Sequence, residues 1–286
     1  MRKTSVAAPL FPSVGTKASK VSPTGPRYEA VDVTPALAEK WLKQNTHNRT
    51  IRERAVLAYA RDMEAGHWAE NGEAIKFATD GTLLDGQHRL NAVVLAGVTV
   101  RMLVITGLAS ATQETMDAGS KRRTADAFGL RGETNAAVLS SVTKRVWMWD
   151  QGDYRFNGPS PTTAEAAALL ERRPDLRRSA DIAVRTHGSF KCLPQSVTGT
   201  AHHLFTRIDG NATVWFFQRL ADGAELPAGH PILTLRTRAM TEAAERRGSR
   251  ADRQMAYLIR TWNAVREGRS LARILQDPDA PMPMPK

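Results

Sequence analysis

Five consecutive polar or small residues, Asp85 to Arg89, interrupt an apolar run in the stretch LLDGQHRLNAVVLAG, residues 83–97. The pattern predicts a strand that ends near Asp85 and a helix that begins near Gln87. Free N–H groups at such a helix start attract anions, and a preceding glycine lets a phosphate approach the backbone. Arg89 could clamp phosphate oxygens, His88 could relay a proton, and Asp85 could hold a metal ion or orient a hydroxyl.

A purely structural interpretation of the same residues is also open. Asp85 could cap the helix while His88 and Arg89 occupy its solvated first turn. Glu73 could act as a general base near a bound γ-phosphate, or it could be an ordinary surface carboxylate. The adjacent pair His202-His203 cannot share one helical face and has no Cys or carboxylate at ligand spacing, so we predict no metal site.

The charge balance of the chain is strongly positive. It has 40 Lys and Arg against 29 Asp and Glu, a formal net charge of +11. Such an excess favours polyanionic partners, DNA above all, over a merely solvated basic surface. The range 162–184, with Pro174 between two helical segments, fits either a DNA-binding helix-turn-helix or a non-binding helical hairpin. The candidate DNA-binding residues are Arg172, Arg173, Arg177, Arg178, Arg246 and Arg247.

Composition excludes other classes of protein. Hydrophobic residues make up 42% and charged residues 24%, which is typical of a globular chain and not of a disordered one. A single cysteine, Cys192, rules out an intrachain disulfide and fits a cytoplasmic compartment. The apolar stretch near the N-terminus is short and broken by prolines, so we expect neither a signal peptide nor a membrane span.

Composition and periodicity divide the chain into four parts. We expect a flexible basic arm at 1–27, an α/β domain at 28–132, a basic helical domain at 133–276 and a loose Pro-rich tail at 277–286. The fold class is therefore α+β, a small mixed-sheet domain followed by a mostly α-helical one.

The first domain alternates strands and helices, and the second is nearly all helical. Asp80-Gly81 predicts a hairpin turn that aims Asp85 and Gly86 away from the sheet. The expected strands are 28–33, 74–77, 82–84 and 98–105. The expected helices are 36–43, 51–65, a helix from about 87 to 97, one entered at 124–128, and then 136–149, 163–172, 175–184, 197–208, 213–220, 232–246 and 252–266.

The central stretch resembles a known superfamily. Residues 84–92, LDGQHRLNA, look like the central motif of the ParB/sulfiredoxin-like superfamily. That motif reads Gly-x-x-Arg-x-x-Ala in ParB proteins, Gly-Cys-His-Arg in sulfiredoxins, and Asp-Gly-x-His-Arg in free serine kinases and DGQHR proteins. Residues 45–49, 72–76 and 117–124 resemble its flanking polar segments, so the resemblance covers about 28–132.

The resemblance implies a nucleotide, ATP or CTP with Mg²⁺, bound through its phosphates. The candidate phosphate-binding residues are Arg49, Gly86, Gln87, His88, Arg89, Ser120, Lys121, Arg122, Arg123 and Thr124. The candidate catalytic residues are Asp85, His88 and Glu73. Sulfiredoxin activity is excluded, because Gln87 stands where those enzymes carry the nucleophilic cysteine.

Three functions stay open. The first is a DNA-associated protein that binds a nucleotide in its ParB/sulfiredoxin-like domain and engages DNA, or a DNA-bound partner, through its helical domain. The second is a kinase or a ParB-like nuclease that uses Mg²⁺. The third is a nucleotide-free adaptor for a DNA-bound protein such as a recombinase. The oligomeric state stays open as well, a homodimer included, and no strong ParB-type helix-turn-helix is recognisable.

Overall fold

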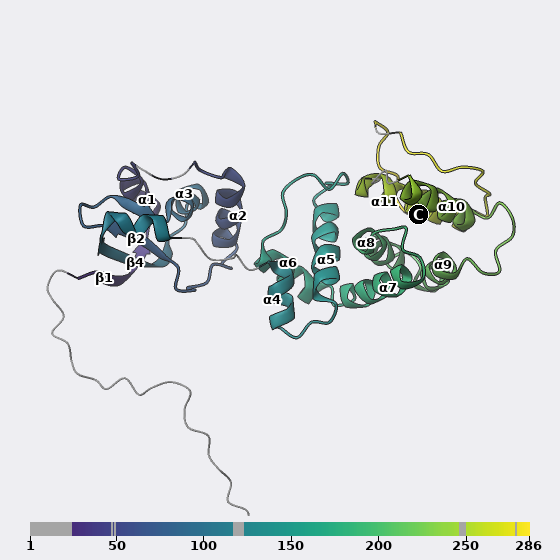
Figure 1. The fold of residues 1–286 in the computed structure, drawn as a ribbon, viewed down its shortest axis with the longest axis horizontal. Helices are drawn as coiled ribbons and strands as arrows, with labels where there is room; N and C mark the ends of the chain where they lie inside the picture. Colours follow the sequence, from purple (N-terminus) through teal and green to yellow (C-terminus); the bar gives the residue numbers. More distant parts are fainter. Residues whose placement is uncertain (1–24, 47, 49, 117–122, 246–249, 278) are drawn as a thin grey trace, which may run out of the picture. The chain divides into compact units, whose positions relative to one another are not determined.

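The computed structural model describes residues 25–46, 48, 50–116, 123–245, 250–277 and 279–286 (Figure 1). Within them the chain forms four strands, eleven α-helices and one 3₁₀ helix, which confirms the α+β class. The chain divides into two compact units. One, the sheet unit, takes in the described parts of Met1–Ile51 and Ala69–Met116, and the other, the helical unit, those of Arg52–Trp68 and Asp117–Lys286.

The sheet is mixed, as predicted. Its strands are β1 (Arg27–Val33), β2 (Ala74–Ala78), β3 (Leu83–Asp85) and β4 (Val100–Leu108), in the order β1-β4-β2-β3. β1 and β4 are antiparallel, β4 and β2 are parallel, and β2 and β3 form an antiparallel hairpin. β3 is therefore an edge strand, and the helix that follows it starts at the side of the sheet.

The turn between β2 and β3 has the chemistry that the sequence predicts. Gly81 has a φ of +87°, and the Asp80 carboxylate accepts a hydrogen bond of 2.9 Å from the Thr82 N–H. The expectation that the hairpin aims Asp85 away from the sheet is wrong. Asp85 is the last residue of β3 and lies opposite Lys76 of β2, because an irregularity in the register after Lys76 extends the pairing to this position.

Two helices cover the sheet unit's core. α1 (Pro35–Leu42) begins at Thr34, whose hydroxyl accepts from the Leu37 N–H at 3.2 Å, and it packs on α3 (Gln87–Ala96). A 3₁₀ helix, η1 (Ser110–Thr115), follows β4. The fully buried side chains between these elements include Ile75, Leu83, Leu90 and Val93. Burial of each such side chain contributes about 1.5–3 kcal/mol.

The helical unit contains the remaining helices. They are α2 (Glu53–Glu64), α4 (Thr124–Leu130), α5 (Ala136–Asp150), α6 (Thr163–Arg172), α7 (Leu176–Ser189), α8 (Gln195–Thr206), α9 (Gly210–Asp222), α10 (Pro231–Ala244) and α11 (Ala251–Arg266). α7 packs against α5, α8 and α9. In a hydrophobic core of this unit, the rings of Phe205 and Trp262 are stacked with their centres 4.5 Å apart. No helix among the described residues is long and apolar enough to cross a membrane.

Helix α2 groups with the helical unit, although the sequence places it in the first domain. Arg61 donates to Glu165 at 2.7 Å, and the Thr162 hydroxyl donates to Asp62 at 2.6 Å. Both bonds attach α2 to the start of α6. The division after residue 116 also precedes the expected boundary at 132, because α4 packs on α5 and α6.

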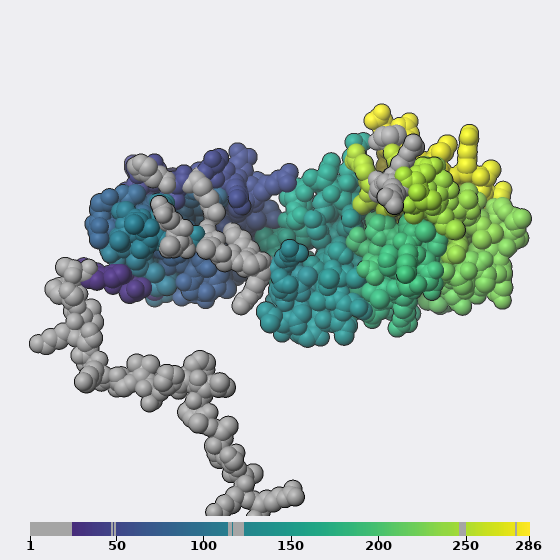
Figure 2. Space-filling model, in the orientation of Figure 1, coloured from purple at the N-terminus to yellow at the C-terminus, as the bar shows by residue number. Residues whose placement is uncertain are grey.

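The C-terminal residues are held by specific bonds, in contrast to the loose tail that the sequence suggested. The Trp262 indole N–H donates to the Lys286 carbonyl at 2.9 Å, and the Asn263 side chain bonds the backbone of both Met284 and Lys286 at 2.9 Å. Figure 2 shows the yellow tail against the light-green surface of the last helices. Because prolines keep the segment extended, its carbonyls stay available to these side chains.

Two adjacent histidines of α8 are buried where α8 meets α7. His202 is 3% exposed and its Nδ1 lies 2.9 Å from the Ser179 hydroxyl, while His203 Nδ1 lies 2.9 Å from Asp175. Burial, together with the charge of Arg178, lowers the pKa of His202 from 6.5 to about 4. Burial also lowers the pKa of His203, although Asp175 opposes the shift.

We expect the helical unit to lose stability in mild acid. From pH 6.5 down to about 4, the unfolded chain takes up a proton at His202 that the folded chain resists. The free energy of unfolding is therefore unaffected by His202 above pH 6.5 and falls by about 3 kcal/mol in total as the pH is lowered towards 4. Urea unfolding across this range checks it. His202→Gln should flatten the pH dependence and His67→Gln, at an exposed position, should not; equal slopes in all three proteins would contradict it.

Candidate phosphate-binding site

The predicted motif lies at the junction of β3 and α3. β3 ends at Asp85, Gly86 has a φ of +108°, and α3 begins at Gln87 with no side chain capping its first turn. The side chains of the first turn are buried, with Gln87 3%, His88 8% and Arg89 9% exposed. The interpretation that His88 and Arg89 occupy a solvated first turn is therefore wrong, because this turn packs into the sheet unit.

Gly86 is required by a close contact with β2. A Cβ atom at this position would lie 2.5 Å from the Ile75 Cδ1 atom and 3.3 Å from its Cα. The positive φ adds a second constraint, since side chains other than glycine are strained there. Packing alone thus explains the glycine, and its presence is not by itself a sign of a ligand.

A cluster of charged side chains surrounds Asp85. Its Oδ2 atom accepts from Lys76 Nζ and from Arg89 Nη2, each at 3.1 Å. Arg89 also donates to the Ala74 carbonyl at 3.0 Å, and its other Nη lies 3.7 Å from Glu73. Glu73 is the outer member, with a side chain that is 62% exposed, against 10% for Arg89. Three of the sequence-predicted residues therefore meet here, joined by Lys76.

Amide side chains cover the free edge of β3. Asn45 donates to the Gln87 side chain at 3.0 Å, and Asn48 donates to the Leu83 carbonyl at 2.7 Å. Gln113 donates to the Leu84 carbonyl at 3.0 Å. These bonds satisfy backbone groups of an edge strand that would otherwise pair with another chain.

Several residues of this site have weak sequence signals. Lys76 is a polar residue within an expected strand, where alternation of polar and apolar residues is ordinary. Asn48 lies in the polar segment 45–49, which resembles a superfamily segment only loosely. Gln113 lies 65 residues from Asn48, to which it donates at 3.1 Å, and no periodicity or motif marks it. Charge complementarity between Lys76 and Asp85 across the Asp80-Gly81 turn is the one signal that could have suggested the pair.

The remaining predicted phosphate-binding residues fall elsewhere. Arg123 and Thr124 belong to the helical unit, where they open α4. The Arg123 N–H donates to Asp126 at 2.7 Å, and the Thr124 hydroxyl lies 3.1 Å from that of Thr163. Outside the described residues lie Arg49, Ser120, Lys121, Arg122, Arg246 and Arg247.

Two of the four described DNA-binding candidates are engaged in ion pairs. Arg173 lies 2.8 Å from Asp150, and Arg177 donates to Glu133 at 2.8 Å. Arg172 and Arg178 are exposed and have no such partner among the described residues.

The geometry of α7 favours the non-binding helical hairpin over a DNA-binding helix-turn-helix. The segment before α5 reaches α7 through Glu133 and through Asn135, which donates to Asp181 at 2.8 Å. α7 also packs against three helices, whereas a recognition helix needs an open face for the major groove.

No group of three His, Cys, Asp or Glu side chains in the described part of the chain is arranged to hold a metal ion. The chain matches no protein-family model, no curated protein and no solved structure.

Replacing Gly86 should destabilise the sheet unit more than replacing a glycine of similar backbone conformation in open space. Gly86→Ala forces a methyl group against Ile75 and should lower the free energy of unfolding by about 3 kcal/mol. Gly81→Ala is the matched control, because Gly81 has a φ of +87° and no atom within 4 Å of the added Cβ. It should lose about 1 kcal/mol. Urea unfolding measures both, and equal losses would contradict the packing argument.

Proposed function

We propose that the chain is a DNA-associated, ParB/sulfiredoxin-like protein whose sheet unit binds the phosphates of a nucleotide at the start of α3. One observation carries the proposal. The cations Lys76 and Arg89 are both bonded to Asp85, the residue that precedes the Gly86–α3 junction. A helix N-terminus next to a lysine and an arginine is a favourable environment for phosphate oxygens.

The charges of the cluster suit a nucleotide with Mg²⁺. Magnesium is commonly held by one or two carboxylates together with phosphate oxygens, and Asp85 and Glu73 both contact Arg89, at 3.1 and 3.7 Å. The ion would neutralise phosphate charge when bound. Lys76 would then pair with a phosphate.

The bonds of Arg89 favour binding over turnover. Its guanidinium already joins the Ala74 carbonyl and Asp85, so it stabilises the junction of helix and sheet and is not free to move with a reacting group. A kinase or nuclease that uses Asp85, Glu73 and His88 is the second candidate, because these carboxylates and Arg89 lie together. A nucleotide-free adaptor for a DNA-bound partner is the third.

Loss of the Lys76 charge should weaken nucleotide binding. We expect ATP or CTP with Mg²⁺ to bind the wild type, and Lys76→Gln to weaken binding about tenfold, equivalent to about 1.4 kcal/mol. Calorimetric titration measures the change. Arg101→Gln is the matched control, because Arg101 is a 54% exposed sheet cation that pairs with Asp32 at 3.2 Å.

The same proteins separate the three candidates. Phosphate release or transfer that Asp85→Asn abolishes would favour the enzyme, and binding without turnover would favour the nucleotide-dependent DNA-associated protein. No binding of ATP or CTP by the wild type would leave the adaptor.

The net charge of +11 and the exposed arginines of the helical unit support the proposed DNA association. Arg178 and Arg185 lie seven residues apart on α7, hence on one side of it, and Arg172 ends α6. All three are exposed. Such residues would contact phosphates and give binding without strong sequence preference.

Duplex binding should fall steeply with salt. Each arginine that neutralises a phosphate adds about 0.9 to the slope of log K against log salt, so Arg172→Ala with Arg178→Ala should reduce that slope by about 2. Fluorescence anisotropy from low to high salt measures the slope. The control pair Lys144→Ala with Arg54→Ala removes two exposed charges from α5 and α2 and should change it less. Binding that is insensitive to salt would contradict DNA association.

A further inference from the structure

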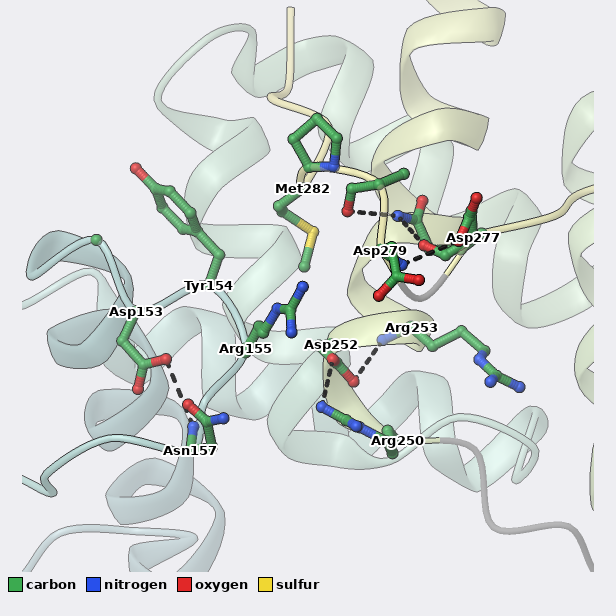
Figure 3. Close-up of a pocket in the computed structure, with 14 residues that line it drawn as sticks. Asp153, Tyr154, Arg155, Asn157, Arg250, Asp252, Arg253, Asp277, Asp279 and Met282 are labelled. Atoms are coloured by element: carbon green, nitrogen blue, oxygen red, sulfur yellow. Dashed lines mark hydrogen bonds and ion pairs between the residues drawn. The ribbon is translucent and has the colours of Figure 1, made fainter.

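The helical unit contains a pocket of about 490 Å³ that is lined by both charged and apolar side chains (Figure 3). Three parts of the chain line it: residues of the loop after α5 (152–155 and 157), residues at the start of α11 (250, 252 and 253), and residues of the tail (276, 277 and 279–282). Its volume falls in the range of about 300–1,000 Å³ that is usual for small-molecule sites. No residue of the cluster around Asp85 belongs to it, so its chemistry is independent of the phosphate site.

The walls of the pocket are fixed by bonds that need no ligand. The Asp153 carboxylate accepts from the Gly158 N–H at 2.8 Å, and Tyr154 packs edge-on against Trp149 with ring centres 4.6 Å apart. On the tail side, Met282 packs against the hydrophobic core that contains Phe205 and Trp262. A pocket with such walls is largely formed before a ligand arrives, which lowers the entropy that binding must overcome.

Most charges in the pocket have partners within it. Asp252 pairs with Arg250 at 3.0 Å and accepts from the backbone N–H of Arg253 at 2.9 Å. Asp277 accepts from the backbone N–H of Asp279, also at 2.9 Å. Arg250 and Asp252 neutralise each other, whereas the Asp277 carboxylate is satisfied by a backbone N–H group alone among the described residues.

Two opposite charges differ from the others. The guanidinium of Arg253 and the carboxylate of Asp279 have no hydrogen-bond or ion-pair partner among the described residues. They belong to different walls, Arg253 to α11 and Asp279 to the tail, and both residues line the pocket. A ligand with a single charge would satisfy one of them and leave the other unpaired.

We propose that this pocket binds a small zwitterion, whose carboxylate pairs with Arg253 and whose ammonium group pairs with Asp279. An amino acid or a short peptide has this charge pattern. The Tyr154 ring and the Met282 side chain, which also line the pocket, would contact the uncharged part of such a ligand. Because the tail supplies one wall, an occupied pocket also stabilises the docked tail.

Three four-carbon probes test the proposal with the full-length chain: γ-aminobutyrate, succinate and 1,4-diaminobutane. Calorimetric or NMR titration should show that the wild type binds γ-aminobutyrate, and glycylglycine as a second zwitterion, about tenfold more tightly than either symmetric probe. Arg253→Gln and Asp279→Asn should each weaken zwitterion binding by about tenfold, since a charge-assisted hydrogen bond contributes about 1.5–3 kcal/mol. Arg273→Gln, an exposed arginine outside the pocket, should leave it unchanged.

Charge reversal gives the sharper result. Asp279→Arg should transfer the preference to succinate, and Arg253→Asp should transfer it to 1,4-diaminobutane. Circular dichroism of each variant verifies that the helices are retained, and Asp279 is exposed, so its variants should not unfold the chain. The proposal is overturned if the wild type binds neither zwitterion, binds all probes equally, or if the folded reversal variants keep the wild-type preference.

Discussion

The attachment of Arg89 to the sheet is the interaction on which the sheet unit depends. One guanidinium donates to the Ala74 carbonyl of β2 and to Asp85 of β3, and thereby fixes where α3 leaves the sheet. Lys76 adds a second positive charge to the same carboxylate. Because these groups are mostly buried, a ligand that separates Arg89 from Asp85 must replace the lost negative charge. A phosphate meets that requirement, whereas a neutral ligand does not.

The same constraint gives the motif two uses. Gly86 lets the backbone pass close to Ile75, and Asp85 before it brings Lys76 and Arg89 together beside the start of α3. Beside it, Asn48 and Gln113 donate to the Leu83 and Leu84 carbonyls of β3, so these acceptors are satisfied within the sheet unit. Residue types that could do chemistry are therefore required by packing too, and motif recognition alone cannot separate the two causes.

Periodicity and end signals located most elements well. α6 begins and ends at the predicted residues, 163 and 172, because a capping box from Thr162 to Glu165 marks its start and Pro174 follows its end. Contacts between distant segments were beyond such reasoning. The attachment of α2 depends on Arg61 reaching a residue 104 positions away, and Asp85 faces Lys76 through an irregular register. Local sequence patterns predict neither contact.

Net charge misleads for a related physical reason. A formal +11 treats every arginine as available, yet Arg173 and Arg177 are neutralised by acids that precede them by 23 and 44 residues. Such ion pairs leave the net charge of the chain unchanged, but they reduce the positive potential around the paired arginines. Arg178 and Arg185, on one side of α7, keep their charge exposed. On α7 a polyanion would therefore meet two neighbouring exposed arginines, which suits contacts to a phosphate backbone more than the reading of bases in a groove.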